Sequence, residues 1–195
     1  MILPVDFIDT SVMTAALVMK HAVHFADDTR RQEASKSPHH DTQMILLRAP
    51  AGDVSRETWF ADVEHADTPL LAEWPSARRV IAAIARSHER RTQQQFGTAI
   101  EPSFGKIMVV RLKAGGFVDW HVDQGAYAEA HDRFHLCLIA SPAAFLYSNG
   151  QAAVLQPGTL AFFDNRKLHG EVNFGPIARD HLIVDIRRAA PETVQ

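Results

Sequence analysis

Three residues of the types that bind metals stand at positions from which they could hold one ion: His121, Asp123 and the distal His169. His121 and Asp123 end a predicted strand, in which residues two apart face the same side of the sheet. We therefore expect both side chains to project into the mouth of a barrel. His169 follows the predicted strand Leu160–Phe163 and a short turn. Alone, a His-x-Asp pair is often a solvated histidine beside a turn-forming aspartate, so the pattern needs support from the rest of the chain.

Two histidines and one carboxylate on one face of an octahedron are the ligand set of mononuclear non-haem Fe(II) oxygenases. The chemistry favours this set because the opposite face stays open, so that a bidentate 2-oxo acid can take two positions and O2 the third. We therefore predict that His121, Asp123 and His169 are both the metal ligands and the catalytic residues.

Two arginines could bind the carboxylate of such an acid inside the barrel. Arg179 stands ten residues after His169 and precedes an apolar strand, and its planar guanidinium can pair with a carboxylate bidentately. Arg133 and His135 lie two residues apart on another predicted strand and share a face. We predict cosubstrate-binding roles for Arg179, Arg133 and His135, and the spacing leaves open which arginine takes the distal carboxylate. In the alternative interpretation, Arg179 and Arg133 lie on the surface and His135 is a core histidine with no role in binding.

The other histidines, out of 11 in the chain, lack such a pattern. His39 and His40 lie in the polar segment Asp27–Asp41, which predicts solvent exposure, although a loop there could cover the site. His181 follows Arg179 by two residues and could serve either the fold or the site. We expect the rest to lie on the surface or on helix faces; they are His21, His24, His65, His88 and His131.

Composition limits the class of protein. The length of 195 residues favours a single domain over residues 1–195, and 46% apolar with 22% charged residues is typical of a packed core. A net charge of −3 without a basic block predicts no nucleic-acid partner. The lone Cys137 excludes a disulfide within the chain. The sequence shows neither a signal peptide nor about 18 consecutive apolar residues, so we expect no membrane association and a cytoplasmic location.

The periodicity changes along the chain. The first part, residues 1–100, is predicted to be helical and to pack on the barrel, with one helix ending near Ala26, a second following Pro75, and a short strand at Met44–Leu47. Between residues 105 and 187, short apolar runs alternate with turns, and Asn149-Gly150 predicts a two-residue hairpin. The predicted fold class is mainly β with flanking α-helices: a double-stranded β-helix, the cupin-like jelly roll.

Four motifs occur in an order that resembles the aspartyl/asparaginyl β-hydroxylase family, which includes bacterial free-proline cis-hydroxylases. They span Lys106–Arg187 and consist of Arg111–Asp123, Arg133-Phe134-His135-Leu136, Phe162-Phe163-Asp164-Asn165 with His169 and Asn173, and Arg179–Asp185. The resemblance implies a double-stranded β-helix, Fe(II), 2-oxoglutarate as cosubstrate, and O2. It also implies hydroxylation of an unactivated carbon of an amino acid, free or within a peptide. Val110 stands where some members have a hydroxyl residue that helps to hold the cosubstrate.

Two other classes of function stay open at this point. One is a non-catalytic, cupin-like metal- or ligand-binding barrel, because the segment from Pro157 to Asn173 partly resembles a cupin motif. The other is a structural β-sandwich with incidental histidines. Succinate formation from 2-oxoglutarate with Fe(II) would separate the oxygenase from both. No motif in the sequence identifies the small-molecule or peptide substrate, or the oligomeric state.

Overall fold

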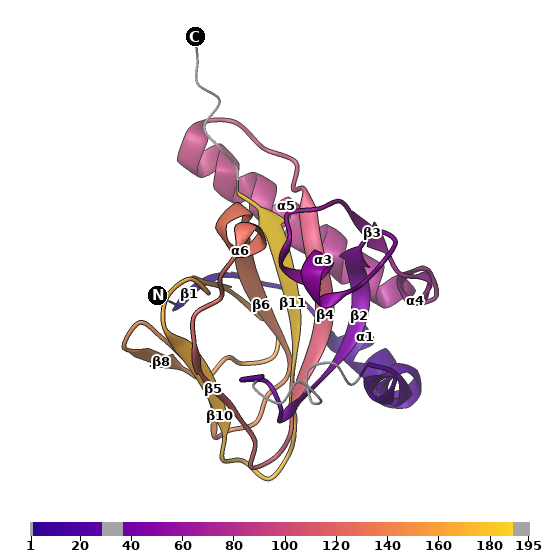
Figure 1. The fold of residues 1–195 in the computed structure, drawn as a ribbon, viewed down its shortest axis with the longest axis vertical. Coiled ribbons are helices and arrows are strands. Elements are labelled where there is room, and N and C mark those ends of the chain that lie inside the picture. The colour runs from indigo at the N-terminus through magenta and orange to yellow at the C-terminus, as the bar shows by residue number, and fades with distance from the viewer. Residues whose placement is uncertain (1, 29–36, 189–195) are drawn as a thin grey trace.

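The computed structural model describes residues 2–28 and 37–188, and its strands form two antiparallel sheets (Figure 1). The larger sheet has the spatial order β1 (Ile2–Phe7), β9 (Thr159–Phe163), β6 (His131–Ile139), β11 (Arg179–Arg187), β4 (Phe104–Leu112), β2 (Thr42–Pro50) and β3 (His65–Asp67). The smaller sheet has the order β5 (Phe117–His121), β10 (His169–Asn173), β7 (Ala144–Ser148) and β8 (Gln151–Ala153). The predicted mainly-β, two-sheet architecture is confirmed.

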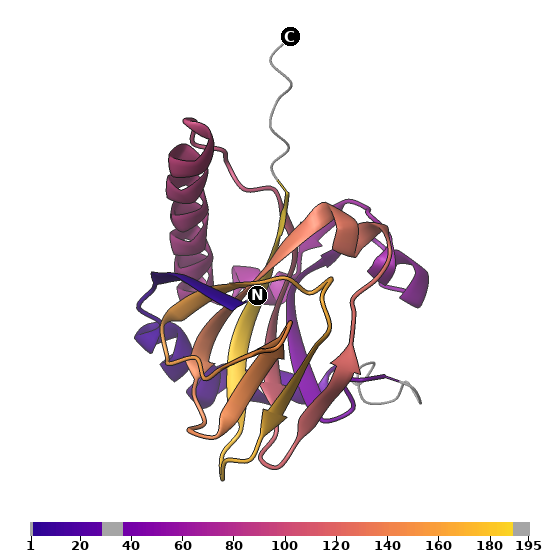
Figure 2. The ribbon, with the colours of Figure 1, turned by 90° about the vertical axis from the view of Figure 1, so that its left-hand side faces the viewer.

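Helices cover one side of the larger sheet. The first helix begins as α1 (Ser11–Ala16), continues through a π-helical turn, η1 (Leu17–His21), and ends as a 3-10 turn, η2 (Ala22–Ala26). The longest helix, α5 (Pro75–Phe96), lies on one side of the larger sheet, with the smaller sheet on the other (Figure 2). There are also three short helices, α3 (Arg56–Phe60), α4 (Pro69–Ala72) and α6 (Ala126–Ala130), of which α3 packs its Trp59 on the opposite face of the larger sheet. Both predicted helices are confirmed, and no helix in the described ranges could cross a membrane.

Strand alternation separates an apolar face of the larger sheet from a polar one. Alternate residues of β6 and β11 pack against α5 in the main apolar cluster. The strand residues include Phe134, Leu136, Leu182 and Val184, and α5 contributes Ile84. The residues between them face the smaller sheet. Cys137 and Ile183 there belong to two smaller apolar clusters, and the others are polar: Arg133, His135, Arg179, His181 and Asp185. The helices therefore bury the apolar face, and the space between the sheets receives the groups that can do chemistry.

The first hundred residues contribute strands as well as helices, which corrects the prediction of a helical part outside a barrel of residues 105–187. β1 pairs with β9 and β2 pairs with β4, so the larger sheet includes the N-terminal segment. β2 also extends beyond the predicted Met44–Leu47. β1 carries Pro4 and Asp6 and pairs with a strand distant in sequence, so its local pattern is weak. Residues 29–36 of the predicted loop Asp27–Asp41 lie outside the described residues.

The predicted hairpin at Asn149-Gly150 joins β7 to β8. Asn149 has φ of 49° and Gly150 has φ of 78°, the left-handed conformations that a two-residue turn of type I′ requires. The turn fixes the register of β7, which is the strand that pairs with β10 and so supports it from one side.

Candidate metal centre

The two strands β5 and β10 bring the predicted ligands to one end of the smaller sheet. His121 and His169 are cross-strand partners, and the centroids of their rings lie 4.0 Å apart. Asp123 follows the end of β5, where its backbone N–H donates to the carbonyl of Asn165 at 2.9 Å. Its Oδ1 then lies 3.5 Å from Nε2 of His121. The structure thus places His121 beside both Asp123 and His169. Among the described residues, however, the three whose ligand atoms all lie within 4.8 Å of one another are His39, His121 and Asp123, so His169 lies near the group without completing it at that distance.

Hydrogen bonds to the backbone fix the orientation of both histidine rings. Nδ1 of His121 donates to the carbonyl of Asp119 at 2.7 Å, and Nδ1 of His169 donates to the carbonyl of Lys167 at 2.8 Å. Because a carbonyl oxygen only accepts, Nδ1 carries a hydrogen in both rings, and Nε2 is the nitrogen left for a metal ion. This arrangement is usual for metal-bound histidines.

Nε2 of His121 provides a test of whether the site fits a cation. The atom is buried and makes no hydrogen bond to any described residue, and it faces the carboxylate oxygen Oδ1 of Asp123. Two atoms that both present lone pairs repel each other unless a cation, either a proton or a metal ion, lies between them or beside them. The donor set of imidazole and carboxylate fits a divalent transition metal.

Asp123 is held as an ionised carboxylate. Nη1 of Arg133 and Nδ2 of Asn165 donate to its Oδ2 at 2.7 and 2.9 Å, which leaves Oδ1 directed toward His121. Burial opposes ionisation, but Arg133 and the other surrounding groups hold the pKa of Asp123 well below its usual range. Burial is the main reason that the pKa of His169 is lowered to about 4, so its ring is neutral at pH 7. Both residues therefore have the protonation states that metal binding requires.

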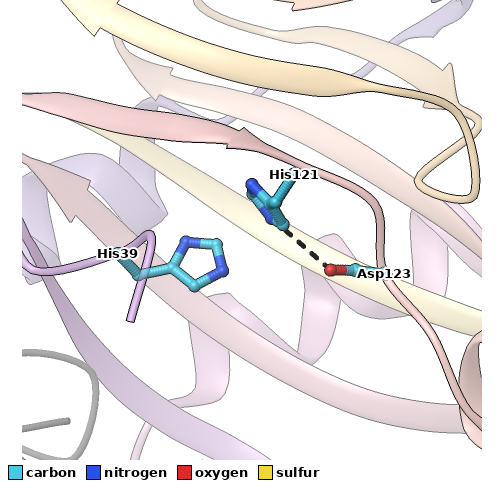
Figure 3. A group of neighbouring side chains, drawn as sticks. All are labelled: His39, His121 and Asp123. Atoms are coloured by element: carbon cyan, nitrogen blue, oxygen red, sulfur yellow. Dashed lines mark ion pairs between the residues drawn. The ribbon is translucent and has the colours of Figure 1, made fainter. Parts of the chain in front are cut away.

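His39 approaches the same place from the N-terminal half of the chain (Figure 3). Its ring lies edge-on to that of His121 at a centroid distance of 4.7 Å, and its nearest ligand atom lies within 4.8 Å of those of His121 and Asp123. The backbone N–H of Asp119 donates to the carbonyl of Pro38 at 3.0 Å, which ties this segment to β5. His39 is half-buried rather than fully exposed, and the contact brings this sequence-distant segment to the mouth of the barrel, which is the alternative that the sequence left open.

Arg133 is buried against two carboxylates rather than solvated at a strand end. Its Nε and Nη2 donate to the two oxygens of Asp185 at 2.8 and 3.0 Å, and its Nη1 reaches Asp123. The guanidinium therefore links the candidate ligand Asp123 to a buried anion of β11. These contacts position Asp123. Because Nε, Nη1 and Nη2 of Arg133 all donate to Asp123 or Asp185, little hydrogen-bonding capacity remains for the carboxylate of a ligand.

Arg179, His135 and His181 gather deeper between the sheets. Arg179 is 3% exposed, and its Nη2 lies 2.6 Å from Oε2 of Glu171. Nδ1 of His135 lies 3.2 Å from Nδ1 of His181. Burial lowers the pKa of His135 to about 3 and that of His181 well below its usual range, so both rings are neutral. Arg179 is thus an interior cation rather than a surface arginine.

Sequence reasoning missed Glu171, although its signal was present. His169, Glu171 and Asn173 alternate along β10, so all three face the interior. Only the fold shows that the carboxylate of Glu171 meets the guanidinium of Arg179.

Comparison with known proteins gives a family and a fold. A family model described as aspartyl/asparaginyl beta-hydroxylase matches residues 83–189. The fold is similar to that of a 2OG-Fe(II) oxygenase family oxidoreductase from Burkholderia pseudomallei, at 16% identity and a TM-score of 0.54 over 94% of this chain and 92% of that one. It is also similar to the viral collagen prolyl hydroxylase vCPH from Paramecium Bursaria Chlorella virus-1, at 11% identity and a TM-score of 0.59 over 97% and 96%. No curated protein sequence matches the chain.

Proposed function

Because the chain belongs to the aspartyl/asparaginyl β-hydroxylase family, we propose that it is an Fe(II)- and 2-oxoglutarate-dependent dioxygenase. Its substrate in this proposal is an amino acid, free or within a peptide, which is hydroxylated at an unactivated carbon. His121, Asp123 and His169 hold the iron. The B. pseudomallei oxidoreductase and the viral prolyl hydroxylase, which share the fold, support this reaction class.

The observation that carries the proposal is that His121 lies against both Asp123 and His169. One lone pair of His121 is buried opposite a carboxylate oxygen at 3.5 Å, and the ring of His169 lies beside it. A barrel without a metal would leave this repulsion to be relieved by a proton. A divalent ion relieves it while using all three side chains, and a set of three protein ligands leaves coordination positions open.

Bound iron supplies the activation of O2 that an unactivated C–H bond requires. The residues of this chain hold and shield the reacting groups. The carbonyls of Asp119 and Lys167 keep the two histidine rings in the metal-binding tautomer. Arg133 and Asn165 keep Asp123 ionised and its carboxylate directed toward His121. A fixed ligand set and limited access of water are the protein's contribution to such a reaction.

Arg179 is the residue that we assign to the distal carboxylate of 2-oxoglutarate. It is a buried cation at the start of β11, between the sheets, whereas the donors of Arg133 are directed to Asp123 and Asp185. Arg133 therefore acts on the ligand Asp123, and Nδ1 of His135, on the same face of β6, lies 3.8 Å from Glu171, the partner of Arg179. A buried guanidinium–carboxylate pair is charge-assisted and geometrically selective.

Succinate formation tests the reaction class. Protein supplied with Fe(II), 2-oxoglutarate and O2 is expected to form succinate, and a screen of free amino acids and peptides by mass spectrometry is expected to reveal a product that has gained one oxygen. His169→Ala, which removes one proposed ligand, should abolish both signals and is the matched control. A protein that binds the metal but forms no succinate with any member of the screen would favour the non-catalytic, cupin-like barrel.

A further inference from the structure

The guanidinium proposed to receive the cosubstrate already has a carboxylate partner within the chain. Oε2 of Glu171 lies 2.6 Å from Nη2 of Arg179, and the two side chains are 9% and 3% exposed. The other oxygen, Oε1, lies 3.8 Å from Nδ1 of His135. Glu171 therefore lies deep between the sheets, on the same strand and the same face as His169.

Formal charge in this part of the interior is balanced without a ligand. Arg179 contributes one positive charge and Glu171 one negative charge, while His135 and His181 are neutral because burial disfavours their charged forms. Asp123, Arg133 and Asp185 form a separate network beside them. A second carboxylate arriving at Arg179 would leave a net negative charge in a site shielded from water, which is costly.

Arg179 pairs with Glu171 through Nη2, and its buried Nε makes no hydrogen bond to a described residue. A second carboxylate could therefore bind Arg179 only beside Glu171, and repulsion between the two like charges weakens its binding relative to a site without Glu171. An added like charge beside a binding group is a recognised way of rejecting a charged ligand.

We infer that Glu171 is a specificity-determining residue that competes with the distal carboxylate of the cosubstrate for Arg179. The inference rests on the proposed function and deepens it. It follows that this chain discriminates weakly between 2-oxoglutarate and a 2-oxo acid of equal length with an uncharged tail, such as 2-oxopentanoate. Removing the charge of Glu171 should restore the preference for the dicarboxylate.

Calorimetric titration of the Mn(II)-loaded protein tests this without turnover. Glu171→Gln keeps the size of the side chain and removes its charge, and we expect it to bind 2-oxoglutarate at least about 10-fold more tightly than the parent chain. Its affinity for 2-oxopentanoate should stay within about threefold of that of the parent chain, because this ligand has no distal carboxylate to pair with Arg179. Glu101→Gln, at an exposed position, is the matched control and should change neither affinity.

Other results would overturn the inference. Unchanged affinity of Glu171→Gln for 2-oxoglutarate would mean that the two carboxylates do not compete. Weaker binding would mean that Glu171 positions Arg179 for the cosubstrate. Glu171→Ala removes the carboxylate altogether and should change the affinity for 2-oxoglutarate in the same direction as Glu171→Gln. It replaces the glutamine variant in the titration if that variant is unstable. Absence of 2-oxoglutarate binding in every folded variant, the parent included, would overturn the proposed function together with this inference, whereas binding by the parent that Arg179→Ala loses would leave the function standing.

Discussion

The two histidines of the candidate metal centre are oriented by the same local device. Each donates from Nδ1 to the backbone carbonyl two residues earlier in the chain, His121 to Asp119 and His169 to Lys167. The orientation of each ring therefore depends on its own segment. Convergence of the two rings depends instead on the pairing of β5 with β10.

His39 and His169 both lie near His121, so their separate removal identifies the third ligand. We expect His169→Ala to weaken Fe(II) or Mn(II) binding at least about 100-fold, because loss of a ligand should exceed the 10- to 100-fold cost of losing an outer contact. His39→Ala should change it by less than about threefold. Metal titration followed by calorimetry measures both. The opposite ranking would transfer the ligand role to His39, whose ligand atom lies within 4.8 Å of those of His121 and Asp123.

The two interior arginines should differ in what they affect. Arg179→Ala is expected to raise the apparent 2-oxoglutarate requirement about 30-fold or more, since truncating one partner of a buried charge pair costs about 2–5 kcal/mol. Metal affinity should change little, because Arg179 contacts no proposed ligand. Arg133→Ala should instead weaken metal binding, because Asp123 loses a donor at 2.7 Å.

Titrations of metal and of 2-oxoglutarate with both alanine variants separate these effects, and Arg86→Ala on the exposed face of α5 is the control. A large 2-oxoglutarate effect confined to Arg133→Ala would move the carboxylate anchor to Arg133. No effect in either variant would contradict the 2-oxoglutarate proposal and favour the cupin-like barrel.

At the scale of elements, the contact between β5 and β10 sets the distance between the two histidines. Gly170 follows His169, and a Cβ added there would lie 3.0 Å from the carbonyl oxygen of Val118 on β5 and 3.5 Å from the ring of Trp120. A side chain at position 170 would therefore require the backbone of β5 at Val118 to move by a few tenths of an ångström. The absence of a side chain at Gly170 allows the close pairing of the two strands.

Gly170→Ala tests this role of the strand pair. We expect about 1 kcal/mol or more of destabilisation from overpacking, together with weaker metal binding, because His121 shifts relative to His169. Urea unfolding with chelator present measures the first effect, and Mn(II) titration measures the second. Stability reduced with metal affinity intact would mean that the spacing of β5 and β10 does not control the site.

At the scale of the whole molecule, burial of neutral histidines makes stability depend on pH. His65 is buried in β3, which corrects the expectation of a surface or helix-face position. Burial lowers its pKa to about 4, and the pKa values of His135 and His181 shift in the same direction. Between pH 6.5 and 4 the unfolded chain binds protons that the folded chain does not. Their stabilising contribution is therefore fully present above pH 6.5 and is lost as the pH falls.

His65 alone should make the protein about 2 kcal/mol less stable at pH 5 than at pH 7, from 1.5 pH units at about 1.36 kcal/mol each. Urea unfolding at the two pH values, with a chelator to remove metal binding, measures the total loss, which the other buried histidines should increase. His65→Gln should reduce the difference between the two pH values. Equal free energies of unfolding at pH 5 and 7 would contradict the burial of these rings as neutral groups.

Features that depend on local pattern could be predicted from the order of the residues alone. The spacing of His121 and Asp123, the alternation of the strands after residue 105, the hairpin at Asn149-Gly150 and the helix after Pro75 all follow from neighbouring residues, because backbone geometry repeats over two to four positions. The order of the family motifs added the reaction class, and the family match to residues 83–189 supports it.

Only the tertiary structure decided which distant segments meet. It joined β1 to β9, brought His39 beside His121, and directed Arg133 to Asp123 and Asp185. It also placed Glu171 of β10 against Arg179 of β11, across the space between the two sheets. Such contacts depend on the register and packing of strands far apart in the chain, and the spacing of residues along one strand carries no information about the strand that faces it.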